Sequence, residues 1–197
     1  MRETELKGVV PDEQDARERL VRAGASLTFH GRLEDRRFDT ASRRLLARDE
    51  VLRIRVAHDA TGTTTQLDFK GPTSYEGGYK HREELSLAVG DSTLCARLLE
   101  NLGFVETRQI DREAQVYELD GAQVRFERYP RMDLLVEIEG NPTAIERAIA
   151  ILGLPRESFT TERVSAFVTR YEARTGLRAA ISDREAQGDF RDSLADA

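Results

Sequence analysis

Alternation between apolar and charged residues recurs along the chain and predicts a series of β-strands. Residues 52–56 place two arginines on one face and three aliphatic side chains on the other, and residues 66–70 repeat this arrangement. Residues 59–62 between them read Asp-Ala-Thr-Gly, a composition typical of a tight turn, so the two strands should form a hairpin. Further strands of the same kind are predicted at residues 82–87, 123–127 and 136–139.

Helical periodicity alternates with these strands. Residues 12–23, 91–102 and 141–152 each carry apolar side chains three or four positions apart and are followed by a glycine. An aspartate caps the first two segments, and an Asn-Pro pair begins the third. A fourth helix is predicted at residues 160–174. Three of these helices therefore have clear sequence signals at both ends.

Two segments lack such patterns. Residues 71–81 contain Gly77-Gly78 and are interpreted as a mobile loop over the mouth of a site. From about residue 177 the periodicity is weak, which predicts a frayed helix or disorder. The expected organisation is one domain over residues 1–175 and a polar tail over residues 176–197.

Composition narrows the class of protein. The 197 residues are 39% hydrophobic and 34% charged, so one domain can fold but must accommodate many charges. The formal net charge of −6 argues against nonspecific nucleic-acid binding. No membrane span or signal-peptide core is evident, so a cytoplasmic location is expected. The lone Cys95, on an apolar helical stripe, is assigned to core packing and excludes an internal disulfide.

The charged faces of the predicted strands contain both signs in equal number. The cations are Lys7, Arg53, Arg55, Lys70, Arg82, Arg112 and Arg125, and the anions are Glu3, Glu5, Asp68, Glu84, Glu127, Glu137 and Glu139. A sheet rolled around an aqueous lumen explains so many charged faces. An open antiparallel sheet with its charged face in water explains them as well, and the spacing alone does not decide between the two.

Several short motifs share one order along the chain. Glu3-x-Glu5-x-Lys7 opens it, and the later motifs are Leu52-Arg53-Ile54-Arg55, Phe69-Lys70-Gly71-Pro72, Arg82-x-Glu84, Arg112 before Tyr117, and Glu137-Ile138-Glu139. In number and order they resemble the CYTH family, which includes class IV adenylyl cyclases, thiamine triphosphatases and other triphosphate tunnel enzymes. The resemblance covers residues 1–172. It implies an α+β fold with a closed eight-stranded antiparallel β-barrel, the triphosphate tunnel, and flanking helices.

The resemblance also implies roles for individual residues. Phosphate-binding cations would be Lys7, Arg53, Arg55, Lys70, Arg82, Arg112 and Arg125, and metal-binding carboxylates would be Glu3, Glu5, Glu127, Glu137 and Glu139. Catalytic roles are implied for Glu5, Lys7 and Glu139. Oxygen-only ligands suit Mg²⁺ or Mn²⁺. We expect the empty lumen to be self-neutralising, with Glu3, Glu5 and Glu84 paired to Lys7, Arg82 and other cations.

Two positions depart from the family pattern. Ser86 replaces a second glutamate after Glu84, and Ala114 replaces a cation two residues beyond Arg112. One phosphate contact is therefore either missing or supplied by Arg108 or Arg125. The resemblance therefore leaves the activity open. The first choice is an adenylate cyclase that converts ATP to cyclic AMP and pyrophosphate. The alternatives are a triphosphatase acting on tripolyphosphate, thiamine triphosphate or a nucleoside triphosphate, and a noncatalytic triphosphate-binding module. The oligomeric state is also open, with a homodimer as one option.

Overall fold

The computed structural model describes residues 2–188 and 192–193, with side chains from residue 4 onward. The strands are β1 (Arg2–Val9), β2 (Ser26–Thr40), β3 (Val51–Asp59), β4 (Gly62–Lys70), β5 (Ser74–Glu76), β6 (Tyr79–Ala88), β7 (Phe104–Leu119), β8 (Ala122–Arg128) and β9 (Leu135–Gly140). The helices are α1 (Glu13–Arg22), α2 (Arg44–Ala47), α3 (Ser92–Asn101), α4 (Pro142–Leu152), the 3₁₀ turn η1 (Arg156–Ser158), α5 (Val164–Thr175) and α6 (Asp183–Gln187). Strands and helices thus alternate along the chain.

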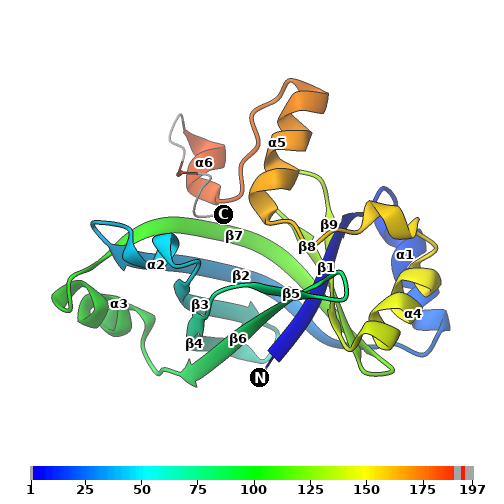
Figure 1. Cartoon of the computed structure of the whole chain (residues 1–197), viewed down its shortest axis with the longest axis horizontal. Helices are drawn as coiled ribbons and strands as arrows, with labels where there is room; N and C mark the ends of the chain where they lie inside the picture. Colours follow the sequence, from blue (N-terminus) through cyan, green and yellow to red (C-terminus); the bar gives the residue numbers. More distant parts are fainter. Residues whose placement is uncertain (1, 189–191, 194–197) are drawn as a thin grey trace.

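Eight strands close into a barrel (Figure 1). Their order is β1-β9-β8-β7-β2-β3-β4-β6, and β6 pairs with β1 to complete the ring. The closing strand is β1, which pairs with β6 through Arg2–Glu5 and with β9 through Glu5–Val9. All pairings are antiparallel, and β5 adds a ninth strand on β6. The closed eight-stranded barrel is therefore confirmed, and the open sheet is wrong.

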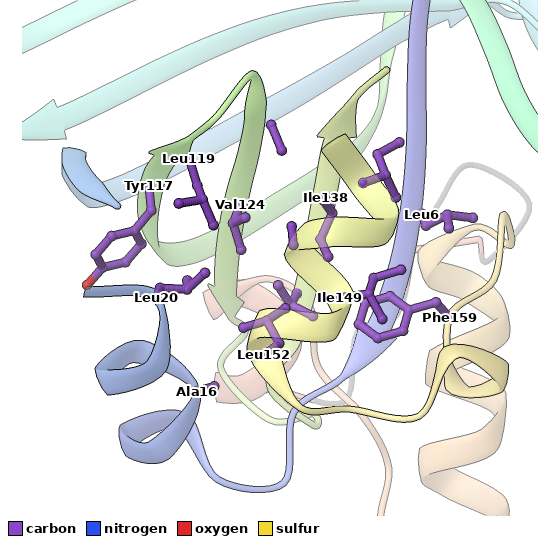
Figure 2. Close-up of a cluster of buried hydrophobic side chains, with 14 of the residues drawn as sticks. Leu6, Ala16, Leu20, Tyr117, Leu119, Val124, Ile138, Ile149, Leu152 and Phe159 are labelled. Atoms are coloured by element: carbon purple, nitrogen blue, oxygen red, sulfur yellow. The ribbon is translucent and has the colours of Figure 1, made fainter. Parts of the chain in front are cut away.

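The largest apolar core lies outside the barrel, between the strands and two helices. Figure 2 shows side chains from β1, β7 and β8, such as Leu6 and Val124, meeting side chains from α1 and α4. Leu6 lies between Glu5 and Lys7 in the sequence, so strand alternation sends it outward while its neighbours point into the lumen. Ile145 of α4 is fully buried there, and its replacement by alanine would cost about 2–5 kcal/mol.

Sequence-encoded caps fix the ends of the predicted helices. The Asp12 carboxylate accepts the backbone N–H of Asp15, and the Asp91 carboxylate accepts two N–H groups at the start of α3. Asn141 caps α4, whose first residue is Pro142, and Gly153 ends it with φ +69°. The four predicted helices are confirmed as α1, α3, α4 and α5.

Two smaller cores hold the remaining elements. Phe38 and Ile54 pack under α3, and Cys95 lies partly buried against this cluster. The second core joins Ile110 of β7 and Phe167 of α5. None of the described helices is long and apolar enough to cross a membrane.

The C-terminal segment differs from its sequence-based expectation. A frayed helix or disorder was predicted for the tail, but residues 177–188 contain the short helix α6, and Ile181 and Glu185 are buried. Residues 189–191 and 194–197 of the predicted tail lie outside the described residues. Ala180 forms a backbone bridge with Arg131, and Ile181 packs beside Phe167 of α5. A few small apolar residues anchor this segment, and such a short run carries no periodicity.

Residues 71–81 were predicted from their glycines to form a mobile loop, but part of this segment is β-strand. They contain β5 and the beginning of β6, which form a hairpin through Gly77 and Gly78, both with positive φ. The glycines therefore make a turn between two short strands. Strand β2 was not among the strands predicted from alternation, because Arg32, Glu34 and Arg36 on its outward face are charged like the residues on its inward face.

Candidate functional site

The inward faces of the strands line a charged cavity of about 330 Å³ inside the barrel. The sequence-predicted site residues on its wall are Glu5, Lys7, Arg53, Arg55, Lys70, Arg82, Arg112, Arg125, Glu127, Glu137 and Glu139. The side chain of Glu3, also predicted as a metal ligand, lies outside the described residues. Alternation on separate strands has thus brought eleven of the twelve predicted side chains to one lumen.

Three carboxylates converge where β1 meets β9. Glu5 is the register partner of Glu139, and Lys7 is the partner of Glu137. Ligand oxygens of Glu5, Glu137 and Glu139 all lie within 4.8 Å of one another. Such a set of oxygen donors fits Mg²⁺ or Mn²⁺. Glu127, which was predicted with them, is not a member of this trio.

Lys7 neutralises part of this acidic cluster. Its Nζ lies 3.2 Å from Oε2 of Glu5 and forms an ion pair with Glu137. Burial acts to lower the pKa of Lys7, but the two carboxylates outweigh it and raise that pKa above its usual value. Burial acts to raise the pKa of Glu5, whereas Lys7 and Lys80 lower it, to about 2. Both groups are therefore charged at neutral pH.

Three arginines on two strands converge on one aspartate. Asp35 of β2 accepts hydrogen bonds from Arg55 Nε at 2.7 Å and from Arg53 Nη1 at 3.2 Å. Arg112 Nη1 lies 3.1 Å from the same Oδ2 that Arg53 contacts. Burial acts to raise the pKa of Asp35, but the arginines, led by Arg112, hold it well below its usual value. Asp35 is thus an ionised carboxylate among the predicted phosphate-binding cations.

The second acceptors of these cations are also carboxylates. Arg53 Nη2 donates to Asp68 at 2.6 Å. Arg112 Nε donates to Glu127 at 2.7 Å, and the hydroxyl of Tyr129 donates to the other Glu127 oxygen at 2.7 Å. Glu127 is therefore held by an arginine and a tyrosine, and its role as a metal ligand stays a prediction.

Arg125 is the arginine of the cavity wall that binds two members of the carboxylate trio. It donates to Glu139 at 2.6 Å and also to Glu137. Burial acts to lower the pKa of Arg125, but Glu137 and Glu139 raise it well above its usual value. A metal ion and Arg125 would therefore share the same two carboxylates.

The expected self-neutralisation of the lumen holds for two of the named acids. Glu5 pairs with Lys7 and Lys80, and Glu84 pairs with Lys70. Arg82 donates to the backbone carbonyls of Gly71 at 2.7 Å and Asp49 at 2.6 Å, and its Nη2 lies 3.9 Å from the Asp49 carboxylate. It thereby connects the residue after β4 with the loop before β3.

The two departures from the family pattern have local explanations. Ser86 donates to Asp68 at 2.7 Å and so supports the acceptor of Arg53. Ala114 is buried and carries no charge. Of its two suggested substitutes, Arg125 lines the cavity, whereas Arg108 is bound by the C-terminal segment, 3.4 Å from Glu185 and 2.5 Å from the carbonyl of Ser193.

Sequence reasoning missed several residues of the cavity wall. Lys80 precedes Arg82 by two positions, so alternation along β6 was a usable signal for it. Asp35 and Arg37 alternate in the same way on β2, a strand that the sequence did not reveal. Burial and the nearby charge of Arg53 lower the pKa of Arg37 to about 9, so it remains protonated at neutral pH.

Comparison with known proteins gives one family. A model described as CYTH domain matches residues 1–144. A relative from Methanocaldococcus jannaschii, named putative adenylate cyclase MJ0240, is 26% identical over 152 residues, which cover 77% of this chain and 84% of the relative.

Solved structures share the same fold. The PH1819 protein of Pyrococcus horikoshii OT3 superposes with a TM-score of 0.69 at 24% identity and covers 82% of this chain and 95% of its own. A protein from Vibrio parahaemolyticus, described as a putative adenylate cyclase, superposes with a TM-score of 0.71 at 16% identity, covering 85% and 97%. At these low sequence identities, the similarity shows a shared fold and nothing more.

Proposed function

The chain belongs to the CYTH domain family, and from this premise we propose that it is a metal-dependent enzyme acting on a triphosphate held inside the barrel. One observation carries the proposal: the carboxylate trio Glu5, Glu137 and Glu139 lies directly beside a lumen lined with lysines and arginines. Carboxylates alone would repel a polyanion, and cations alone would only bind it. The combination suits a substrate that arrives with a divalent metal.

The cations of the lumen would hold the phosphates. Arg53, Arg55 and Arg112 present planar guanidinium groups that match phosphate oxygens bidentately, whereas Lys7 and Lys70 contribute compact charges. These groups lie on four different strands, β1, β3, β4 and β7, so a bound triphosphate would be contacted from several sides. Fixing its orientation in this way is the main contribution that a protein makes to phosphoryl transfer.

The carboxylate trio would hold Mg²⁺ or Mn²⁺. When bound, such an ion supplies neutralisation of phosphate charge and activation of an attacking oxygen. Lys7 and Arg125 now occupy carboxylates of the trio, and both are cations that also bind phosphate readily. We therefore expect Glu5, Lys7 and Glu139 to act at the reacting end of the substrate.

Cyclisation of ATP is the first candidate reaction. Its support is the 26% identical relative that is named a putative adenylate cyclase. In this reaction the ribose 3′-oxygen attacks the α-phosphorus, the bond to the pyrophosphate oxygen breaks, and the hydroxyl proton passes to solvent. The lumen cations would stabilise the departing pyrophosphate, and no covalent enzyme intermediate is needed.

Hydrolysis of a triphosphate is the second candidate, and the cavity wall favours it. The aromatic lining residues are Phe38, which packs under α3, and Tyr129, which is hydrogen-bonded to Glu127. Neither offers an open ring face on which a purine would stack. A substrate recognised through its phosphates, such as tripolyphosphate, needs no such surface, and water would replace the ribose oxygen as nucleophile.

Product analysis separates these candidates. Purified protein is incubated with ATP, tripolyphosphate or thiamine triphosphate, each with Mg²⁺ or Mn²⁺, and a Glu137→Gln, Glu139→Gln double variant serves as control. Cyclic AMP and pyrophosphate would support cyclisation, and orthophosphate would support hydrolysis. If the protein binds a triphosphate but converts none of the three with either metal ion, the proposal of an enzyme is wrong. The protein would then be a triphosphate-binding module.

A further inference from the structure

Asp35 occupies the centre of the arginine cluster. Its Oδ1 accepts a hydrogen bond from Arg55 Nε at 2.7 Å, and its Oδ2 accepts hydrogen bonds from Arg55 Nη2 at 2.9 Å and Arg53 Nη1 at 3.2 Å. The same Oδ2 forms an ion pair with Arg112 Nη1 at 3.1 Å. Only 2% of its surface is exposed. Its strand, β2, lies between β3, which carries Arg53 and Arg55, and β7, which carries Arg112. One carboxylate therefore links guanidinium groups from both neighbouring strands.

The three arginines depend on Asp35 to different degrees. Arg53 and Arg112 each have a second carboxylate, Asp68 and Glu127 respectively. For Arg55, Asp35 is the one carboxylate in ion-pair contact within the described part of the chain. The fork-to-fork contact with Arg55 uses its Nε and one Nη, which leaves further N–H donors of that guanidinium for a ligand.

A buried carboxylate at this position opposes the binding of an anion. Coulomb repulsion between Asp35 and a phosphate would reduce affinity, so its charge alone is a disadvantage in a triphosphate site. Without a shared acceptor, however, Arg53, Arg55 and Arg112 would repel one another, and their long side chains would adopt many rotamers. The geometry therefore explains Asp35 as a group that orders cations before the ligand arrives.

We propose that Asp35 is a positioning residue that spaces the guanidinium groups of Arg53, Arg55 and Arg112 to match neighbouring phosphoryl groups of a triphosphate. This inference rests on the proposed function for the identity of the ligand. It assigns to Asp35 no contact with the substrate, only the orientation of three groups that make such contacts. Preorganised donors bind and stabilise charge better than mobile ones.

The test is calorimetric titration of the full chain with tripolyphosphate in the absence of metal, so that no turnover is required. Asp35→Glu keeps the charge but displaces the carboxylate by one methylene, and Asp35→Asn removes the charge. We expect both variants to bind roughly 10- to 100-fold more weakly, the usual cost of losing a group that orients ligand-binding side chains. If Asp35 acted only through its charge, Asp35→Glu would bind tripolyphosphate with unchanged affinity and Asp35→Asn would bind it more tightly.

Asp111→Asn is the matched control. Asp111 is a fully buried carboxylate on β7 that contacts Arg32 and the N–H of Asp183, away from the cavity wall. This variant should be destabilised yet bind tripolyphosphate as the unmodified protein does. The Nε–H signal of Arg55, observed by NMR, should exchange rapidly with water in both Asp35 variants and remain protected in the control.

Each outcome of the test is decisive. Tripolyphosphate affinity that is unchanged in Asp35→Glu, or raised in Asp35→Asn, would overturn the positioning role. Failure of both variants to fold while Asp111→Asn folds would assign Asp35 to the fold instead. Binding of tripolyphosphate by the unmodified protein without turnover of any triphosphate would reject the proposed enzyme, while the affinity comparison would still decide the role of Asp35.

Discussion

The charges of the lumen are organised as buried ion pairs, so individual residues there serve both stability and binding. Arg53 and Asp68 are both nearly inaccessible to solvent and lie 2.6 Å apart. Removing one member of such a pair leaves an uncompensated buried charge, which costs far more than losing an exposed pair. A substitution in the lumen will therefore change the free energy of unfolding as well as ligand affinity.

Arg53→Ala should lower the free energy of unfolding by about 3–5 kcal/mol, because Asp68 is left without its guanidinium partner. Adding Asp68→Asn should restore much of this loss. Arg156→Ala, which breaks the exposed pair with Glu146, is the control and should cost at most about 1 kcal/mol. Urea unfolding measures all three, and equal effects of Arg53→Ala and Arg156→Ala would place Arg53 in solvent.

Acid should destabilise the protein through the lumen carboxylates. The folded-state pKa is about 2 for Glu5 and lies below the ordinary value for Asp35, Asp68, Glu127 and Glu137. Since the unfolded chain binds more protons than the folded chain in this range, the stability present above pH ~4.5 should be lost progressively toward pH 2. Thermal unfolding measured from pH 6 to pH 2 tests this, and a flat melting temperature would contradict it.

Sequence reasoning at the residue scale succeeded where a strand was recognisable. Alternation and motif order located Arg53 and Arg55 correctly, because a period of two fixes which side chains share a face. It could not find Asp35, because both faces of β2 carry charged residues around this position and no apolar/polar alternation marks the strand. Its assignment of Glu127 to the metal ligands stays a prediction, and in this structure Glu127 accepts hydrogen bonds from Arg112 and Tyr129.

At the scale of elements, the C-terminal segment packs against the outside of the barrel. Ile181 and Ala179 pack with Phe167 and Val168 of α5 and with Ile110 in the middle of β7. Backbone bonds between Ala180 and Arg131 attach the same segment to the turn before β9. Capped helices were predictable because their signals are local, whereas this attachment depends on long-range contacts that leave no periodic pattern.

Ile181→Ala should lower the free energy of unfolding by about 2–5 kcal/mol, because it opens a cavity between α6 and α5. Leu177→Ala is the control from the same segment. Its side chain is 57% exposed, so the change should stay within about 0.5 kcal/mol. Urea unfolding measures both variants. If both substitutions lower the free energy of unfolding equally and only slightly, the result would support the frayed tail predicted from the sequence.

For the whole molecule, the placement of metal ligands and cations in one lumen couples two binding events. Arg125 and Lys7 are bound to the carboxylates that a metal would need. A metal would release these cations to the phosphates, and the phosphates would complete the oxygen shell of the metal. Binding of either partner should therefore strengthen binding of the other.

We expect Mg²⁺ to increase tripolyphosphate affinity by about 5-fold or more, after correction for association of metal and tripolyphosphate in solution. Calorimetric titration with and without Mg²⁺ measures the coupling. Glu139→Gln should reduce it while leaving metal-free binding largely intact, because Glu139 belongs to the carboxylate trio. Identical affinities with and without Mg²⁺ in the unmodified protein would indicate a simple anion receptor.

The pairing of β1 with both β6 and β9 has a consequence for the order of folding. Glu5 faces Lys80 on one side and Glu139 on the other, so β1 must pair with two strands that follow it far along the chain. The carboxylate trio therefore exists only once β1 has paired with β9. We expect Mg²⁺ to leave the rate of refolding unchanged and to slow unfolding, since its ligands come together only through this pairing of distant segments. Stopped-flow refolding and unfolding measure both rates, and faster refolding with Mg²⁺ would show that the ion recruits β1 early.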